Sequence, residues 1–388
     1  MGRKNKAGFL LVFFAFTILS GASTELAEKE KIEASIENGV RFLRAGQLEN
    51  GEFLTYNLKL GKELKRSPYI TSLIMHSIAA VKNNADTEEI RRNGVAFLLS
   101  ARENGTFWRF SKTFPLDTDD TFLSMYALAE NGIKTDEKSV ESLLRHRNRE
   151  GLFFLWITNT TAENKRFQFP NIDHLNGFTL KTNISTEDMK RVKNFAEDNL
   201  GEDNLYYSWI LELIGKNKTL HKQTFSYVGC EENLNALSYF SFTNKSFDSH
   251  DAVCTYLKES MIARNYQCCM YCASPYVLFY LYTRAYSDAR ATCLQEGVNI
   301  ITEELVKNQG KDGCWGSPLD TSMATVSLIN AGYEGPSLKR AVSCILARQR
   351  GDGGWDKDVI APADGSREIT TAVSLEALAK YETQDGKI

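Results

Sequence analysis

Three acidic residues stand close together at the start of an apolar segment: Asp117, Asp119 and Asp120. Neighbouring carboxyl groups raise one another's pKa by like-charge repulsion, and burial in apolar surroundings adds a desolvation cost to the ionised form. A carboxyl group kept protonated in this way can serve as a general acid. The same residues could instead cap a helix, because acidic side chains accept hydrogen bonds at a helix start and complement its dipole. Both interpretations stay open on this pattern alone.

The segments that must position these carboxyl groups form a repeat along the chain. One type of segment reads as an amphipathic helix that ends in a glycine-rich turn followed by an aromatic residue. Segments of this type end at Gln47 with Gly51 and Phe53, at Asn104 with Trp108, at Gln309 with Gly313 and Trp315, and at Gln349 with Gly353 and Trp355.

A second type of segment starts with Pro, Asp, Asn or Glu and is apolar on nearly every side. A helix of this kind must be enclosed by other helices. The enclosed candidates are 68–81, 117–129, 233–242, 275–286, 320–331 and 368–381. The amphipathic candidates, which alternate with them, are 31–46, 87–102, 136–148, 248–263, 290–308 and 337–349.

Six enclosed helices alternating with six amphipathic ones predict an all-α fold, a single α6/α6 toroid in which the inner helices line the core and the outer helices cover them. The two parts of this toroid are expected at 24–149 and 229–388. Between them, 150–228 breaks the rhythm and is expected to be an insertion or lid. It contains Trp156, His174 and two expected helices, at 185–198 and 203–215.

The first 23 residues have the order of a secretory signal peptide. Basic residues at positions 3, 4 and 6 precede an apolar run from Phe9 to Leu19, and small residues follow up to Ser23. This order predicts cleavage after Ser23 and an exported protein, periplasmic or extracellular. The near-neutral charge, formally -3, excludes a generally basic nucleic-acid binder.

All eight cysteines lie between Cys230 and Cys344. Export permits disulfides, but the spacing alone does not assign the pairs. A metal site at Cys268, Cys269 and Cys272 is disfavoured, because no second CxxC segment or histidine pair accompanies the cluster. The sequence has none of the common nucleotide, metalloprotease or serine-hydrolase signatures, so no cofactor and no metal are expected.

The repeat resembles that of the terpenoid cyclase and protein prenyltransferase superfamily, whose toroid is an α6/α6 barrel. The segments at Gln309 and Gln349 look like the QW repeats of squalene–hopene cyclases, and the segment at Gln47 is a weaker copy with Phe53 in place of Trp. The resemblance is closest to these class II terpene cyclases. It covers nearly the whole chain after the leader as architecture.

The acidic segment carries the resemblance further. Residues 115–121, with 126–128 after them, look like the DxDDT…AL segment of class II cyclases. The resemblance implies that Asp119 is the proton donor, with Asp117 and Asp120 as its electrostatic partners. It also implies an isomerase or cyclase that folds a polyprenyl or triterpene-type chain, with aromatic side chains stabilising the carbocation.

The resemblance brings further expectations. The substrate would be a hydrophobic isoprenoid small molecule, and a peripheral membrane contact would suit it. In the family a histidine is hydrogen-bonded to the acid, and His146 and His174 are the candidates. The two-toroid cyclases hold their cavity between the toroids, so the insertion at 150–228 would have to supply the missing wall here.

Four other readings compete. Asp312 and Cys314 resemble half of the zinc site of prenyltransferases, but no histidine follows His250. Cys230 only approximates the thioester sequence of complement-like proteins. Paired carboxylates on an α6/α6 barrel could also hydrolyse glycosides, although neighbouring residues rarely straddle a sugar. The main alternative is a non-catalytic, secreted toroid that binds a ligand or protein, in which Asp119 would be bonded to backbone N–H groups.

Overall fold

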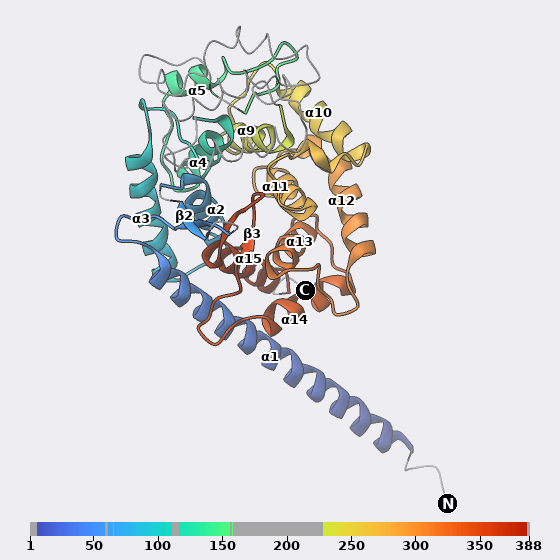
Figure 1. The fold of residues 1–388 in the computed structure, drawn as a ribbon. Helices are drawn as coiled ribbons and strands as arrows, with labels where there is room; N and C mark the ends of the chain where they lie inside the picture. Colours follow the sequence, from blue (N-terminus) through green and yellow to red (C-terminus); the bar gives the residue numbers. More distant parts are fainter. Residues whose placement is uncertain are drawn as a thin grey trace, which may run out of the picture.

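The computed structural model of the chain describes residues 6–58, 61–64, 66–110, 116–155, 157 and 228–385. Within these ranges the chain is mostly helical (Figure 1). The expected helices at 185–198 and 203–215, and the residues Pro115, Trp156 and His174, lie outside the described residues.

Six helices in the described part of the chain are buried on nearly every side. They are α2 (Pro68–Ile78), α4 (Thr118–Glu130), α9 (Cys230–Phe242), α11 (Pro275–Ser287), α13 (Pro318–Asn330) and α15 (Arg367–Asp385). Each contacts the next in chain order, and α15 contacts α2, so the six form a closed ring (Figure 1). Their burial follows from the sequence, because none of them has a continuous polar face to turn toward water.

The amphipathic helices lie outside this ring (Figure 1). They are α1 (Lys6–Gly46), α3 (Ala85–Ala101), α5 (Glu137–Leu143), α10 (His250–Ile262), α12 (Gln295–Asn308) and α14 (Pro336–Ala347). Two 3-10 turns accompany them, η4 (Tyr266–Cys268) and η5 (Thr292–Leu294). The prediction of alternating enclosed and amphipathic helices is thus confirmed for the helices that the structure describes.

Several predicted boundaries are wrong: α1 begins at Lys6 instead of 31, and α12 begins at Gln295 instead of 290, after η5. The structure gives the reasons for two others. The helix expected at 136–148 ends at Leu143, because the next N–H groups bond three residues back instead of four: His146 N–H donates to the carbonyl oxygen of Leu143 (2.9 Å). The helix expected from residue 233 begins at Cys230, because the Glu232 carboxylate accepts a hydrogen bond from the backbone N–H of Gly229 and caps the earlier start.

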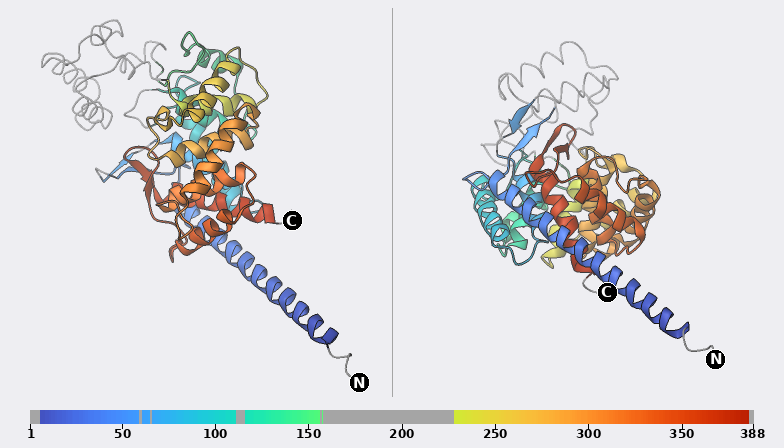
Figure 2. Two further views of the ribbon diagram at one scale, coloured as in Figure 1. Left: turned by 90° about the vertical axis from the view of Figure 1, so that its right-hand side faces the viewer. Right: turned by 90° about the horizontal axis from the view of Figure 1, so that it is seen from below.

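The all-α prediction also missed a small antiparallel sheet. Its strands are β1 (Thr55–Asn57), β2 (Lys62–Leu64), β3 (Asp358–Val359) and β4 (Asp364–Ser366), in the order β2-β1-β4-β3. In the register, Tyr56 faces both Glu63 and Gly365. The sheet joins the segment before α2 to the segment before α15 and lies at one face of the helical ring (Figure 2).

The predicted signal peptide falls in the first part of α1, which extends away from the ring (Figures 1 and 2). Its removal stays a prediction. No helix among the described residues is both long and apolar enough to cross a bilayer.

The repeated glutamines bind three of the outer helices, α1, α12 and α14, each to the next outer helix of the ring. Gln349, at the end of α14, donates from Nε2 to the carbonyl oxygens of Gly353 (2.9 Å) and Ser35 (2.8 Å), and Ser35 belongs to α1. Gln47 and Gln309 make corresponding pairs of bonds, each to a glycine four residues on and to a carbonyl of the next outer helix. The Gln349 contact therefore joins the last outer helix to the first.

The repeated tryptophans tie the outer helices to the starts of the inner ones. Trp108 Nε1 donates to the carbonyl oxygen of Leu98 in α3 (2.8 Å), and its backbone N–H donates to Thr121 Oγ1 in α4 (3.1 Å). Trp315 and Trp355 make the same two kinds of bond. Thr121 follows directly on the acidic segment, so the hydrogen bond from Trp108 to Thr121 fixes the position of that segment.

Gly353 provides a test of the junction between the ends of the chain. Its φ is +88°, and a Cβ there would lie 2.3 Å from the backbone oxygen of Asn38 in α1. We expect Gly353→Ala to lower the free energy of unfolding by about 2–3 kcal/mol, through left-handed strain and this clash. Gly351→Ala is the matched control, since a Cβ there meets nothing within 4 Å. Equal urea midpoints for the two variants would contradict this account.

Candidate active site

The acidic segment opens helix α4, and its three carboxyl groups do different things. Asp117 is the N-cap residue: its Oδ1 accepts a hydrogen bond from the backbone N–H of Asp120 (2.6 Å). Its own carbonyl oxygen accepts from Thr121 Oγ1 (2.6 Å). The capping interpretation therefore holds for Asp117.

Asp119 is held differently. Its Oδ1 accepts a hydrogen bond of 2.6 Å from Nδ2 of Asn235, which lies on the neighbouring inner helix α9. The bond thus leaves α4 and crosses to another helix. Asp119 is only 8% exposed, so its carboxyl group lies almost wholly out of water.

Asn235 is in turn held by a buried arginine. Arg284, on α11, donates from Nη2 to Oδ1 of Asn235 (2.5 Å). The guanidinium carbon lies 5.7 Å from the ring centroids of both Tyr126 and Tyr280. Three consecutive inner helices therefore contribute one residue each to a chain of hydrogen bonds that ends on Asp119.

Burial is the main cause of the raised pKa values of the carboxyl groups in this segment. It raises the pKa of Asp119 to about 6, although the Asn235 hydrogen bond and the Arg284 charge both pull that pKa down. Burial likewise raises the pKa of Asp117 to about 7. Burial and the adjacent Asp117 raise the pKa of Asp120 well above its usual range. The sequence predicts like-charge repulsion as the first cause, but for Asp119 burial dominates instead.

Neither predicted histidine is hydrogen-bonded to Asp119 in the described structure. His146 lies elsewhere, with its ring edge-on to Phe107 at 6.2 Å between centroids, and burial lowers its pKa to about 4. His174 lies outside the described residues. Asn235 instead makes the hydrogen bond to Asp119 that a histidine was expected to make. The sequence could have indicated this residue, because it is a polar side chain within a helix that is enclosed on every side.

The start of α9 adds two carboxyl groups that sequence reasoning gave no role. Glu232 accepts from the backbone N–H of Gly229, and burial followed by the charge of Glu231 raises its pKa well above the usual range. Glu231 accepts from the backbone N–H of Tyr271 (3.4 Å). Both are almost fully buried. Carboxyl groups therefore gather at the adjoining starts of α4 and α9.

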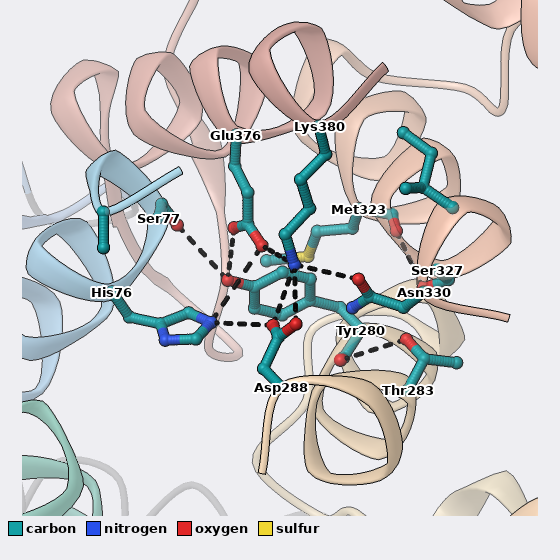
Figure 3. Close-up of polar contacts among 12 residues, drawn as sticks. His76, Ser77, Tyr280, Thr283, Asp288, Met323, Ser327, Asn330, Glu376 and Lys380 are labelled. Atoms are coloured by element: carbon teal, nitrogen blue, oxygen red, sulfur yellow. Dashed lines mark hydrogen bonds and ion pairs between the residues drawn. The ribbon is translucent and has the colours of Figure 1, made fainter. Parts of the chain in front are cut away.

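Another polar cluster, largely buried, gathers side chains from the C-terminal parts of several inner helices (Figure 3). Lys380 Nζ lies 2.8 Å from Asp288 Oδ2, 2.8 Å from Asn330 Oδ1 and 3.0 Å from Glu376 Oε1. His76 Nδ1 lies 2.8 Å from a Glu130 oxygen. Burial alone would lower the pKa of His76, but the Glu130 carboxylate and the hydrogen bond with Asp288 raise it to about 9.

A metal ion fits this cluster poorly. His76, Asp288 and Glu376 offer ligand atoms that lie within 4.8 Å of one another, which is close enough for a divalent cation. The Lys380 ammonium group, however, already pairs with both carboxylates and supplies the positive charge (Figure 3). A cation would have to displace this lysine, whose side chain is only 20% exposed.

The cysteines form four disulfides: Cys230–Cys268, Cys254–Cys293, Cys269–Cys272 and Cys314–Cys344. These bonds remove the thiolates that a zinc site at Cys314 or a thioester at Cys230 would need. They also occupy the Cys268, Cys269 and Cys272 cluster. Cys230 is the first residue of α9, so the first bridge anchors the helix that carries Asn235.

No protein-family model matches the sequence, and no curated protein sequence matches it at a significant level. Solved structures do match its fold. A crystal structure of a protein from Actinoplanes aligns with a TM-score of 0.62 and 14% identity, covering 90% of this chain and 99% of that chain.

Type II terpene cyclase MstE from Scytonema has the same fold. A variant of it in complex with merosterolic acid A, its product, aligns with a TM-score of 0.63 and 13% identity over 92% of this chain and 99% of that chain. A variant in complex with geranylgeranyl dihydroxybenzoate, its substrate, aligns with a TM-score of 0.61 and 13% identity over 92% and 98%. The terpenoid cyclase-like fold that the sequence resemblance implied is therefore shown.

The Lys380 cluster gives a prediction about stability. Lys380→Met would leave Asp288 and Glu376 without their ammonium partner in the ring, so we expect a loss of about 3 kcal/mol in the free energy of unfolding. Lys339→Met is the control: Lys339 pairs with Glu28 at 3.3 Å but is 66% exposed, and its removal should cost under about 1 kcal/mol. Calorimetry that finds equal melting temperatures for the two variants would refute the buried ion-pair account.

Proposed function

We propose that this chain is a single α6/α6 toroid that acts as a class II terpene cyclase-like isomerase, with Asp119 as the general acid that starts cyclisation of a polyprenyl chain. The observation that carries the proposal is the hydrogen bond from Asn235 to Asp119 Oδ1. A residue that served only to cap α4 would accept from the N–H groups of its own helix, as Asp117 does.

The chemistry follows from the two oxygens of Asp119. Because Oδ1 accepts from Asn235, the transferable proton belongs on Oδ2. Its transfer to one alkene carbon forms a C–H bond, leaves the other carbon as a tertiary cation, and turns Asp119 into a carboxylate. The Asn235 hydrogen bond and the nearby Arg284 charge stabilise that carboxylate, so they make the acid stronger than burial alone would allow.

Buried aromatic side chains near this segment suit a carbocation. Tyr69 of α2 lies within electrostatic range of Asp119: burial and then the Asp119 charge raise its pKa well above the usual range. Tyr126 and Phe122 lie further along α4, both fully buried. Aromatic faces attract cations, and their bulk excludes water that would quench the intermediate.

The fold neighbours suggest the substrate class. The MstE complexes name a geranylgeranyl-bearing substrate and a merosterolic acid product, so we propose a hydrophobic isoprenoid as the ligand of this chain. The four disulfides support export to an oxidising compartment, periplasmic or extracellular, where a peripheral membrane contact would help to collect the substrate.

Asp119→Asn tests the proposal directly. Purified protein and variant would be incubated with C15 to C30 polyprenyl substrates, and cyclic products would be measured by gas chromatography with mass spectrometry. We expect the wild type to form product and Asp119→Asn to lower the rate by about 10³-fold, because the amide cannot donate the acidic proton.

Asp320→Asn is the matched control for this substitution, because Asp320 also lies in the first turn of an inner helix. It should retain the wild-type rate. Absence of product from every substrate with folded wild type would leave the non-catalytic binding toroid as the function, and an active Asp119→Asn variant would assign the acid elsewhere.

The pKa of Asp119 predicts the pH dependence. Only the protonated form can donate, so the rate should fall as pH rises through about 6. The same raised pKa means that the native state binds this proton more tightly than the unfolded chain, so its contribution to stability is lost as pH rises from about 4 to about 6. Asp119→Asn should therefore be more stable than wild type at pH 7. A rate that stays constant from pH 5 to 8 would contradict the assignment.

A further inference from the structure

We infer that Arg284 is a positioning residue: it fixes the amide of Asn235 so that the amide nitrogen, and not the carbonyl oxygen, faces Asp119. The inference rests on the proposed role of Asp119 as the acid. It concerns a residue two inner helices away from Asp119, on α11, that reaches the acid through Asn235.

Chemistry fixes the orientation of this amide. An asparagine side chain has a donor end and an acceptor end, and a half-turn about its last bond exchanges them. A guanidinium group can only donate. The atom that meets Arg284 Nη2 at 2.5 Å must therefore be the carbonyl oxygen of Asn235, and the nitrogen is left to face Asp119 at 2.6 Å.

The orientation decides where the Asp119 proton resides. With the amide nitrogen toward it, Oδ1 accepts a hydrogen bond, which favours the carboxylate and leaves the proton on Oδ2 for transfer. With the amide reversed, the carbonyl oxygen would face Asp119 and would have to accept that proton itself. The acid would then be weaker and its proton would point at a protein atom instead of a substrate.

Among the described residues, Arg284 makes few polar contacts besides its hydrogen bond to Asn235. It is fully buried, and its Nε and Nη1 atoms have no hydrogen-bond partner among the described residues. Its hydrogen bond to Asn235 is accompanied by the flanking rings of Tyr126 and Tyr280, which hold the guanidinium by cation–π contact. A buried guanidinium that makes a single hydrogen bond is costly, so its presence points to a function of that bond.

Several titratable groups surround this chain of contacts. They are Tyr69 and His76 from α2, Asp117, Asp120, Tyr126 and Glu130 from α4, Glu231 and Glu232 from α9, and Tyr280 from α11. The tyrosines titrate far above neutral pH. Asp117, with a pKa of about 7, titrates close to Asp119, so the test must identify the Asp119 signal individually.

Three substitutions of Arg284 separate charge from orientation. Arg284→Gln keeps a donor for Asn235 without the charge, Arg284→Met removes both, and Arg284→Lys keeps both. The Asp119 carboxyl group would be titrated by ¹³C NMR on purified, aspartate-labelled protein, with its signal assigned by its loss in Asp119→Asn. The titration needs no turnover, so it tests the inference even if the proposed cyclase activity fails.

We expect Arg284→Met to raise the pKa of Asp119 by about one unit or more and Arg284→Gln to raise it by less, while Arg284→Lys stays near wild type. Where product forms, the falling limb of the pH–rate profile should move upward in the same order, and the rate of Arg284→Met should drop about tenfold. Equal pKa values for the Met and Gln variants would overturn the inference, because the charge alone would then explain the effect.

A second measurement covers the case in which Arg284→Met does not fold. In the wild type, the Asn235 side-chain NH₂ signals should shift with the titration of Asp119. In Arg284→Gln the same coupling should persist. If the chemical shifts of the Asn235 NH₂ group in the wild type did not change as Asp119 titrates, the inference would be overturned, because the carbonyl oxygen would then face the acid.

Discussion

Enclosure of the inner helices is the constraint on which the rest of the structure depends. Helices α2, α4, α9, α11, α13 and α15 have no continuous polar face, so each is stable in water only while neighbours cover it. The contact of α15 with α2 closes the ring, and Gln349 secures the closure by binding Ser35 of α1. Polar groups inside this ring must find partners from other helices, and the two buried clusters arise in this way.

The same enclosure separates the roles of neighbouring carboxyl groups. Asp117 meets the N–H of Asp120 and completes the start of α4, whereas Asp119, two residues on, points across to Asn235 of α9. Burial makes both hold their protons more tightly, and a hydrogen bond stabilises each carboxylate, but the bond to Asp117 comes from its own helix, whereas the bond to Asp119 comes from α9. An acid whose pKa is raised by burial, and whose carboxylate is stabilised once it has given up its proton, suits the protonation of an alkene.

Local signals in the sequence predicted the architecture well and the site only in part. Pro68 and Pro275 marked the starts of α2 and α11 to the residue, since proline suits the first helical position. Strands of two or three residues, such as Asp358–Val359, are too short to show a two-residue period, so the sheet was missed. Asn235 and Arg284 escaped notice because their partners are 116 and 49 residues away in the chain, and no spacing rule connects them.

Solvent isotope labelling tests the central claim most directly. If Asp119 donates the proton that starts cyclisation, that proton exchanges with solvent before transfer, and the reaction in D₂O must place one non-exchangeable deuterium in each cyclic product. The account predicts a mass increase of one unit in product formed by the wild type, and no labelled product from Asp119→Asn. Cyclic product formed in D₂O without deuterium would contradict it, because cyclisation would then begin without protonation by this acid.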